Sequence, residues 1–116
     1  MMPTTAEWVD KAEADYDAAC TLRRSRKRNR FDAICFHCRQ CAEKYLKARL
    51  NESGIRFGKT HDLDVLLKQL HSVEPLWLVM GPALKRLTDF AVAVRYPGTS
   101  TNQTAAAETF ATCRRL

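Results

Sequence analysis

No hydrophobic run in the sequence is long enough to cross a membrane. The longest nearly apolar stretch, residues 76–84, has nine residues and contains Gly81-Pro82, whereas a membrane-spanning helix needs about 20 apolar residues. Residues 1–7 have neither a basic start nor an apolar stretch, so no secretory signal is expected. These absences predict a cytoplasmic protein that does not contact membranes.

Several catalytic and phosphate-binding motifs are also missing. The sequence contains no Gly-rich phosphate loop, no nucleophile elbow and no paired-carboxylate site, and no histidine follows His71. No cofactor is therefore expected. The five cysteines are odd in number, and without a targeting segment they are expected to be reduced thiols.

Three of these cysteines, Cys35, Cys38 and Cys41, are spaced by three residues and suggest zinc or iron–sulfur ligation. On a helix they would fan over about 120°, since each three-residue step rotates about 300°. A second ligand group with matching spacing is absent. Because Cys35 and Cys38 fall on an apolar stripe, we expect core packing and no metal site.

The positive charge is concentrated in one segment. The chain has 19 basic and 13 acidic residues, a net charge of +6. The whole excess lies in six basic residues between positions 23 and 30: Arg23, Arg24, Arg26, Lys27, Arg28 and Arg30. This basic patch suits a phosphate-bearing partner. The alternative is a solvated helix end, where cations also interact well with the helix dipole.

The apolar residues recur at helical spacing along the whole chain. Predicted helices cover residues 4–25, 31–50, 60–70 and 82–96, with a short helix or turn at 75–80 and a last helix from about residue 100. Thr4 with Glu7, Thr60, and Ser100 with Gln103 are the expected caps, and Gly54 is expected in a left-handed conformation. The prediction is a single all-α domain, residues 1–116, folded as an up-and-down bundle of four or five helices. Because such a bundle has a limited core, a homodimer would add stability.

Polar side chains share one face of the second predicted helix. His37, Gln40, Lys44 and Lys47 are spaced by three, four and three residues, with Glu43 beside them. This stripe could bind nucleotides, RNA or a partner chain, or it could be an ordinary solvated face.

Two further residues could carry chemistry. His61 could act as an acid or base or could belong to a helix cap. Arg95 could bind phosphate or could favour the helix dipole as a C-terminal cation.

Taken in order, four segments resemble the HEPN family (higher eukaryotes and prokaryotes nucleotide-binding domain). They are residues 8–15 (WVDKAEAD), 36–48 (FHCRQCAEKYLKA), 61–63 (HDL) and 95–97 (RYP). The resemblance implies a helical bundle that commonly dimerises. It also implies a gene neighbour that encodes a small nucleotidyltransferase, as in two-gene modules of the toxin–antitoxin kind. Several relatives cut RNA without a metal, using an Arg followed after four to six residues by a His.

That nuclease motif is incomplete in this sequence. If Arg95 is the motif arginine, the histidine should occur at positions 100–102, which are Ser100, Thr101 and Asn102. Our leading hypothesis is therefore a HEPN domain that binds nucleotide or RNA phosphate and pairs with a nucleotidyltransferase, with Tyr96 stacking on a base. The predicted site consists of Gln40, Glu43, Lys44, Lys47, His61, Arg95 and Tyr96.

Two alternatives remain open. One is a metal-independent ribonuclease in which His61 or His37 acts as the base and Arg95 stabilises the developing charge. The other is a pure protein-interaction module, in which the polar stripe contacts another protein.

Overall fold

A computed structural model describes residues 2–25, 30–93 and 103–115. Its elements are α1 (Pro3–Arg23), α2 (Arg30–Glu52), α3 (Leu63–Gln69), the 3₁₀ helix η1 (Pro75–Met80), α4 (Gly81–Ala93) and α5 (Gln103–Arg114). The predicted all-α bundle is confirmed, and the described residues contain no strand. None of the described helices combines the length and the apolar character that a membrane crossing requires.

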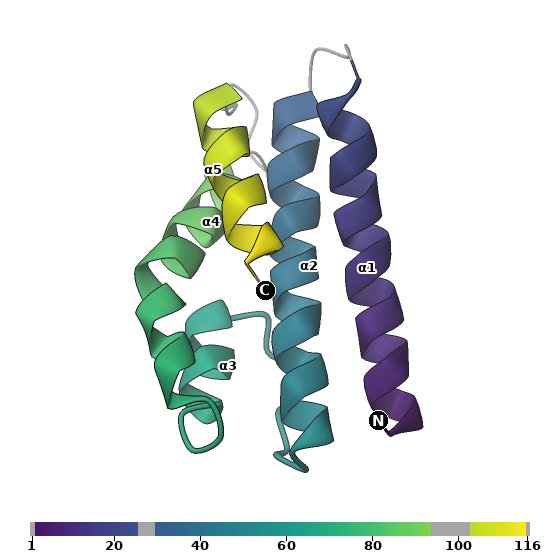
Figure 1. Cartoon of the computed structure of the whole chain (residues 1–116). Coiled ribbons are helices and arrows are strands. Elements are labelled where there is room, and N and C mark those ends of the chain that lie inside the picture. Colours follow the sequence, from purple (N-terminus) through teal and green to yellow (C-terminus); the bar gives the residue numbers. More distant parts are fainter. Residues whose placement is uncertain (1, 26–29, 94–102, 116) are drawn as a thin grey trace.

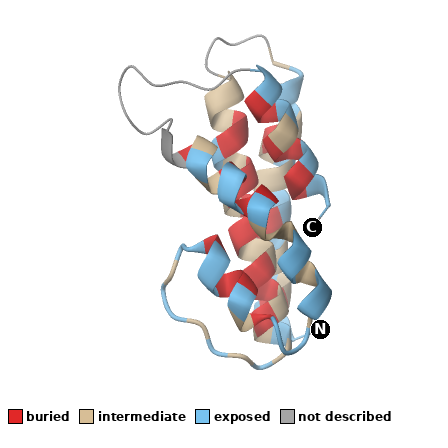
Figure 2. Cartoon of the chain, turned by 90° about the vertical axis from the view of Figure 1, so that its left-hand side faces the viewer, coloured by how far each residue is buried: buried red, intermediate tan, exposed pale blue. Residues whose placement is uncertain are grey.

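Helix α2 is the centre of the bundle (Figure 1). It runs antiparallel to α1 on one side and is flanked on the other side by α3, α4 and α5. Because neighbours cover α2 on both sides, little of its circumference remains for solvent. Figure 2 shows the result, with buried residues (red) on the faces that the helices turn toward one another.

The core combines small residues of α1 with larger ones elsewhere. Ala12 and Ala19 are fully buried, and their small side chains let α1 approach α2 closely. Cys38 and Leu46 continue the core along α2. On α3 and α4 the core positions of this cluster are leucines, and α5 adds three residues of other types. These core residues are Leu63, Leu66, Leu67, Leu84, Leu87, Ala106, Phe110 and Cys113.

Helix ends agree only in part with the predicted caps. Gly54 has φ 70°, and the Ile55 amide donates to the Leu50 carbonyl, so the left-handed end of α2 is confirmed. The predicted cap at Thr60 is wrong, because Asp62 is the residue whose side chain accepts from the first amides of α3.

The start of α1 also differs from the prediction. This helix begins at Pro3, and Met2 precedes it without a side-chain cap, so the expected capping box of Thr4 and Glu7 is not formed. Proline needs no amide partner at this position. Ser100 lies outside the described residues.

Candidate functional site

Three charged side chains of α2 form a buried ion cluster. Arg39, Glu43 and Lys47 are four residues apart and therefore share one face of the helix. Arg39 Nη1 donates to Glu43 Oε1 at 2.9 Å, and Lys47 Nζ donates to Glu43 Oε2 at 3.2 Å. All three residues are buried. Two cationic side chains thus share one carboxylate, which leaves one positive charge in excess.

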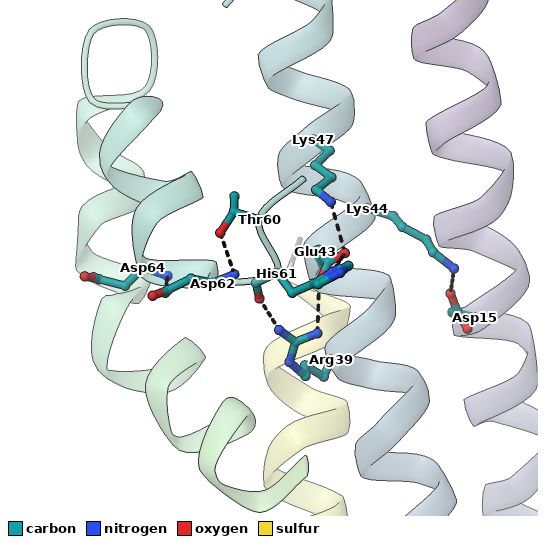
Figure 3. Close-up of polar contacts among 9 residues, drawn as sticks. All are labelled: Asp15, Arg39, Glu43, Lys44, Lys47, Thr60, His61, Asp62 and Asp64. Carbon is teal, nitrogen blue, oxygen red and sulfur yellow. Dashed lines mark hydrogen bonds and ion pairs between the residues drawn. The ribbon is translucent and has the colours of Figure 1, made fainter. Parts of the chain in front are cut away.

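The 53–62 loop, which connects α2 to α3, brings His61 onto this cluster (Figure 3). The Nδ1 atom of His61 lies 3.0 Å from Glu43 Oε2 and 3.2 Å from Oε1. Arg39 Nη2 donates to the backbone carbonyl of His61. The loop is therefore held to α2 through both the backbone and the side chain of one residue. We call Arg39, Glu43, Lys47 and His61 the Glu43 cluster.

The Glu43 cluster keeps its carboxylate ionised. Burial by itself would raise the pKa of Glu43, but hydrogen bonds from His61, Arg39 and Lys47 outweigh burial and lower this pKa. The Lys47 charge lowers it further. A buried, ionised carboxylate with several donors is a fixed anchor for the cations around it.

A second polar cluster joins α2 to α1. Asp15 of α1 accepts from Lys44 Nζ through Oδ2, and its Oδ1 lies 2.9 Å from His37 Nδ1. This carboxylate fixes the orientation of the His37 ring. Lys44 is thus directed toward α1, away from the Glu43 cluster (Figure 3).

The predicted polar stripe therefore divides into two parts. Glu43, Lys47 and His61 meet in one cluster, whereas Lys44 and His37 meet Asp15 in the other. One side of the stripe faces α1 and the other side faces the 53–62 loop, which explains the division. The expectation of an ordinary solvated face is wrong, because Glu43 and Lys47 are buried. Gln40 is half-buried on α2.

Several predicted residues cannot be placed in either cluster. Arg95 and Tyr96 lie outside the described residues, as do Arg26, Lys27 and Arg28 of the basic patch. Two other arginines of the patch lie over aromatic rings. The Arg23 guanidinium lies 4.1 Å from the Phe110 ring centroid, and the Arg30 guanidinium lies 4.4 Å from the Phe31 ring centroid. Arg24 is exposed.

The cysteines of α2 lie in the core, as predicted. Cys35, Cys38 and Cys41 are fully buried, and Cys113 of α5 is almost so. Hydrogen bonds with the Cys38 and Cys41 thiols, together with burial, raise the pKa of Cys113. Among the described residues, no group of three or more His, Cys, Asp or Glu is placed to hold a metal ion.

The sequence interpretation missed Arg39, Trp8 and Phe57. Arg39 could have been found from its spacing, because it precedes Glu43 by the same four residues that separate Glu43 from Lys47. Trp8 and Phe57 lie next to each other and next to Lys47 in space, but they are far apart in sequence. No sequence signal pairs them.

Comparison with known proteins gives the family. The HEPN domain profile matches residues 5–116, which is nearly the whole chain. The chain belongs to the HEPN domain family. The all-α bundle described above agrees with this membership, and the family resemblance read from the sequence is confirmed. No curated protein and no solved structure matches this HEPN domain significantly.

Proposed function

We propose that this HEPN domain binds the phosphate of a nucleotide or RNA at the Glu43 cluster. The observation that supports this most is the charge of the cluster. Arg39 and Lys47 are buried with a single carboxylate between them, so one positive charge lacks a counterion within the cluster. A phosphate oxygen would supply that counterion and would accept charge-assisted hydrogen bonds.

The surroundings of the Glu43 cluster also favour an anion. His61 is exposed at its outer side and gains a positive charge when protonated. The same loop carries two further exposed cations, Arg56 and Lys59. Together these side chains extend the positive charge from the buried cluster to the surface, where it would attract a nucleic acid.

The proposed activity is binding, without cleavage by the motif of the nuclease relatives. A histidine four to six residues after Arg95 is absent from the sequence. Loss of a positioned acid or base typically costs a factor of about 10²–10⁴ in rate. We therefore expect the bound RNA to be recovered intact.

The test is a binding titration with a dye-labelled single-stranded oligoribonucleotide, compared between the wild type and Lys47→Met. Methionine keeps the length of the side chain and leaves Arg39 and Glu43 as a balanced pair, so the fold should persist. We expect affinity to fall by about tenfold, the typical value of a hydrogen bond to a charged group. The salt dependence of the binding constant should also decrease by about one released ion.

Lys85→Met is the matched control, since Lys85 lies on the surface of α4 and, among the described residues, forms an exposed ion pair with Asp89. It removes the same charge and should leave RNA affinity unchanged. Equal loss in both variants would show attraction by net charge alone, and binding that does not respond to salt would contradict the proposal.

We also propose that the protein forms a homodimer and pairs with a small nucleotidyltransferase in a two-gene, toxin–antitoxin-like module. Family membership supports this, together with apolar side chains on η1 that are available to another protein: Leu76 is 84% exposed and Val79 is 83% exposed. Light scattering of the purified protein, alone and mixed with the neighbour-encoded protein, tests it. A monomer that does not bind the second protein would contradict the proposed homodimer and pairing.

A further inference from the structure

Two neighbouring aromatic rings lie beside the ammonium group of Lys47. Its Nζ atom lies 5.4 Å from the ring centroid of Trp8, on α1, and 5.8 Å from that of Phe57, on the 53–62 loop. The two rings meet edge to face, with centroids 5.9 Å apart and an interplanar angle of 65°. Lys47 therefore touches the Glu43 carboxylate and an aromatic surface at the same time.

Packing of the bundle does not account for Trp8. The side chain is only half-buried, and Trp8 is not among the described side chains that form the hydrophobic core or pack against it, whereas Phe57 is. A large indole that rests on a loop residue and a lysine adds little to a core it does not reach. Its partly exposed ring is available to a planar ligand next to a cation.

We propose that Trp8 and Phe57 form a stacking platform for an unpaired base of the nucleic acid whose phosphate lies at the Glu43 cluster. This inference rests on the proposed function. A base and its phosphate are joined through one ribose, and Lys47 lies between the two surfaces that would receive them. Bases of a duplex are stacked on each other and cannot reach the rings, so the platform selects single strands.

The chain provides a specific reporter for this contact, because it contains two tryptophans. Trp77 lies in a separate groove, which Val9, Tyr45 and Arg49 also line. The variant Trp77→Phe therefore leaves Trp8 as the only tryptophan. We expect single-stranded oligouridylate to quench its fluorescence, whereas an RNA duplex and inorganic tripolyphosphate should leave the emission unchanged.

Affinity measurements separate the two halves of the ligand. Trp8→Leu should lower the affinity for oligouridylate by about tenfold, as expected for loss of one stacked base. Its affinity for tripolyphosphate should stay at the wild-type value. Trp77→Phe is the matched control and should bind both probes like the wild type. Circular dichroism checks that each variant is folded, and the quenching measurement does not require a change at Trp8.

The outcomes distinguish this inference from the proposed function. If tripolyphosphate and oligouridylate both bind, but the Trp8 emission does not change and Trp8→Leu binds oligouridylate normally, the platform is overturned and the phosphate site stands. If neither probe binds the wild type, the proposed phosphate site is overturned, and the platform falls with it. Quenching together with selective loss of oligouridylate binding supports both.

Discussion

The carboxylate of Glu43 lies 3.0 Å from the Nδ1 atom of His61, although the two side chains are 4% and 74% exposed. This contact joins a buried side chain of α2 to an exposed side chain of the 53–62 loop. Arg39 strengthens the link by donating to the His61 carbonyl. The 53–62 loop is therefore attached to buried groups of α2 through both the side chain and the backbone of His61.

Glu43→Gln should destabilise the fold. The substitution leaves Arg39 and Lys47 buried without a carboxylate, and breaking a buried ion pair by removing one partner typically costs about 3–5 kcal/mol. Urea denaturation followed by circular dichroism measures the loss. Asp89→Asn, which breaks the exposed Lys85–Asp89 pair, is the control and should change stability by less than about 0.5 kcal/mol. Equal unfolding midpoints for Glu43→Gln and wild type would contradict a buried, charge-paired cluster.

The stability of the wild type should depend on Glu43 at acid pH. Its pKa in the folded state lies below the ordinary value of 4.5. The stabilisation from this shift is complete above about pH 4.5 and is lost as pH falls through the lowered pKa of the folded state. The unfolding free energy of wild type and of Glu43→Gln should be measured between pH 3 and pH 6. The difference between the two proteins should become smaller as the pH falls. A difference that stays constant over this range would show that Glu43 does not titrate with a lowered pKa.

Asp15→Asn should weaken the attachment of α1 to α2 without affecting RNA binding. Asp15 accepts from both Lys44 and His37, and the amide cannot replace its charge. Because both partners are partly exposed, we expect a loss of about 1 kcal/mol in unfolding free energy. Asp17→Asn, at an exposed position two residues further along α1, is the matched control.

A double-mutant cycle of Asp15→Asn with Lys44→Met isolates the pair. Additive effects of the two substitutions would show that the contact contributes nothing. A decrease in RNA affinity in Asp15→Asn would show that this second cluster also belongs to the binding site.

The sequence predicted the bundle because the spacing of apolar residues reports directly which face of a helix is buried. Cys35 and Cys38 were placed on an apolar stripe and expected in the core, and the structure agrees. Helix starts were harder to predict, because several polar residues near each start could cap it. Asp62, two positions after Thr60, provides the cap of α3.

The candidate site was predicted less completely, for a physical reason. The polar stripe of α2 looks solvated in sequence, and only the arrangement of the neighbouring helices shows that Glu43 and Lys47 are buried. The same arrangement turns Lys44 toward Asp15 and brings Trp8 next to Phe57. These contacts join residues distant in sequence. Nucleotide or RNA binding at the predicted site stays a prediction, with the residues Gln40, Glu43, Lys44, Lys47, His61, Arg95 and Tyr96.

Thiol reactivity tests the packing of α5 on α2. Cys20 is half-buried, whereas Cys35, Cys38, Cys41 and Cys113 are buried. The raised pKa of Cys113 also keeps that thiol protonated, and a protonated thiol is a poor nucleophile. With a disulfide reagent such as DTNB at neutral pH, we expect one of the five thiols to react quickly in the native protein, and all five in guanidinium chloride.

Cys20→Ser should abolish the fast phase, because it removes the one thiol that is not buried. The remaining thiols should react only at the rate at which the bundle opens, so adding denaturant should accelerate them. Fast reaction of further thiols in Cys20→Ser would mean that α5 separates from α2 under native conditions. Conformations in which Cys113 contacts the buried thiols of α2 would then be a minority of the native ensemble. The stable core would consist mainly of α1 to α4.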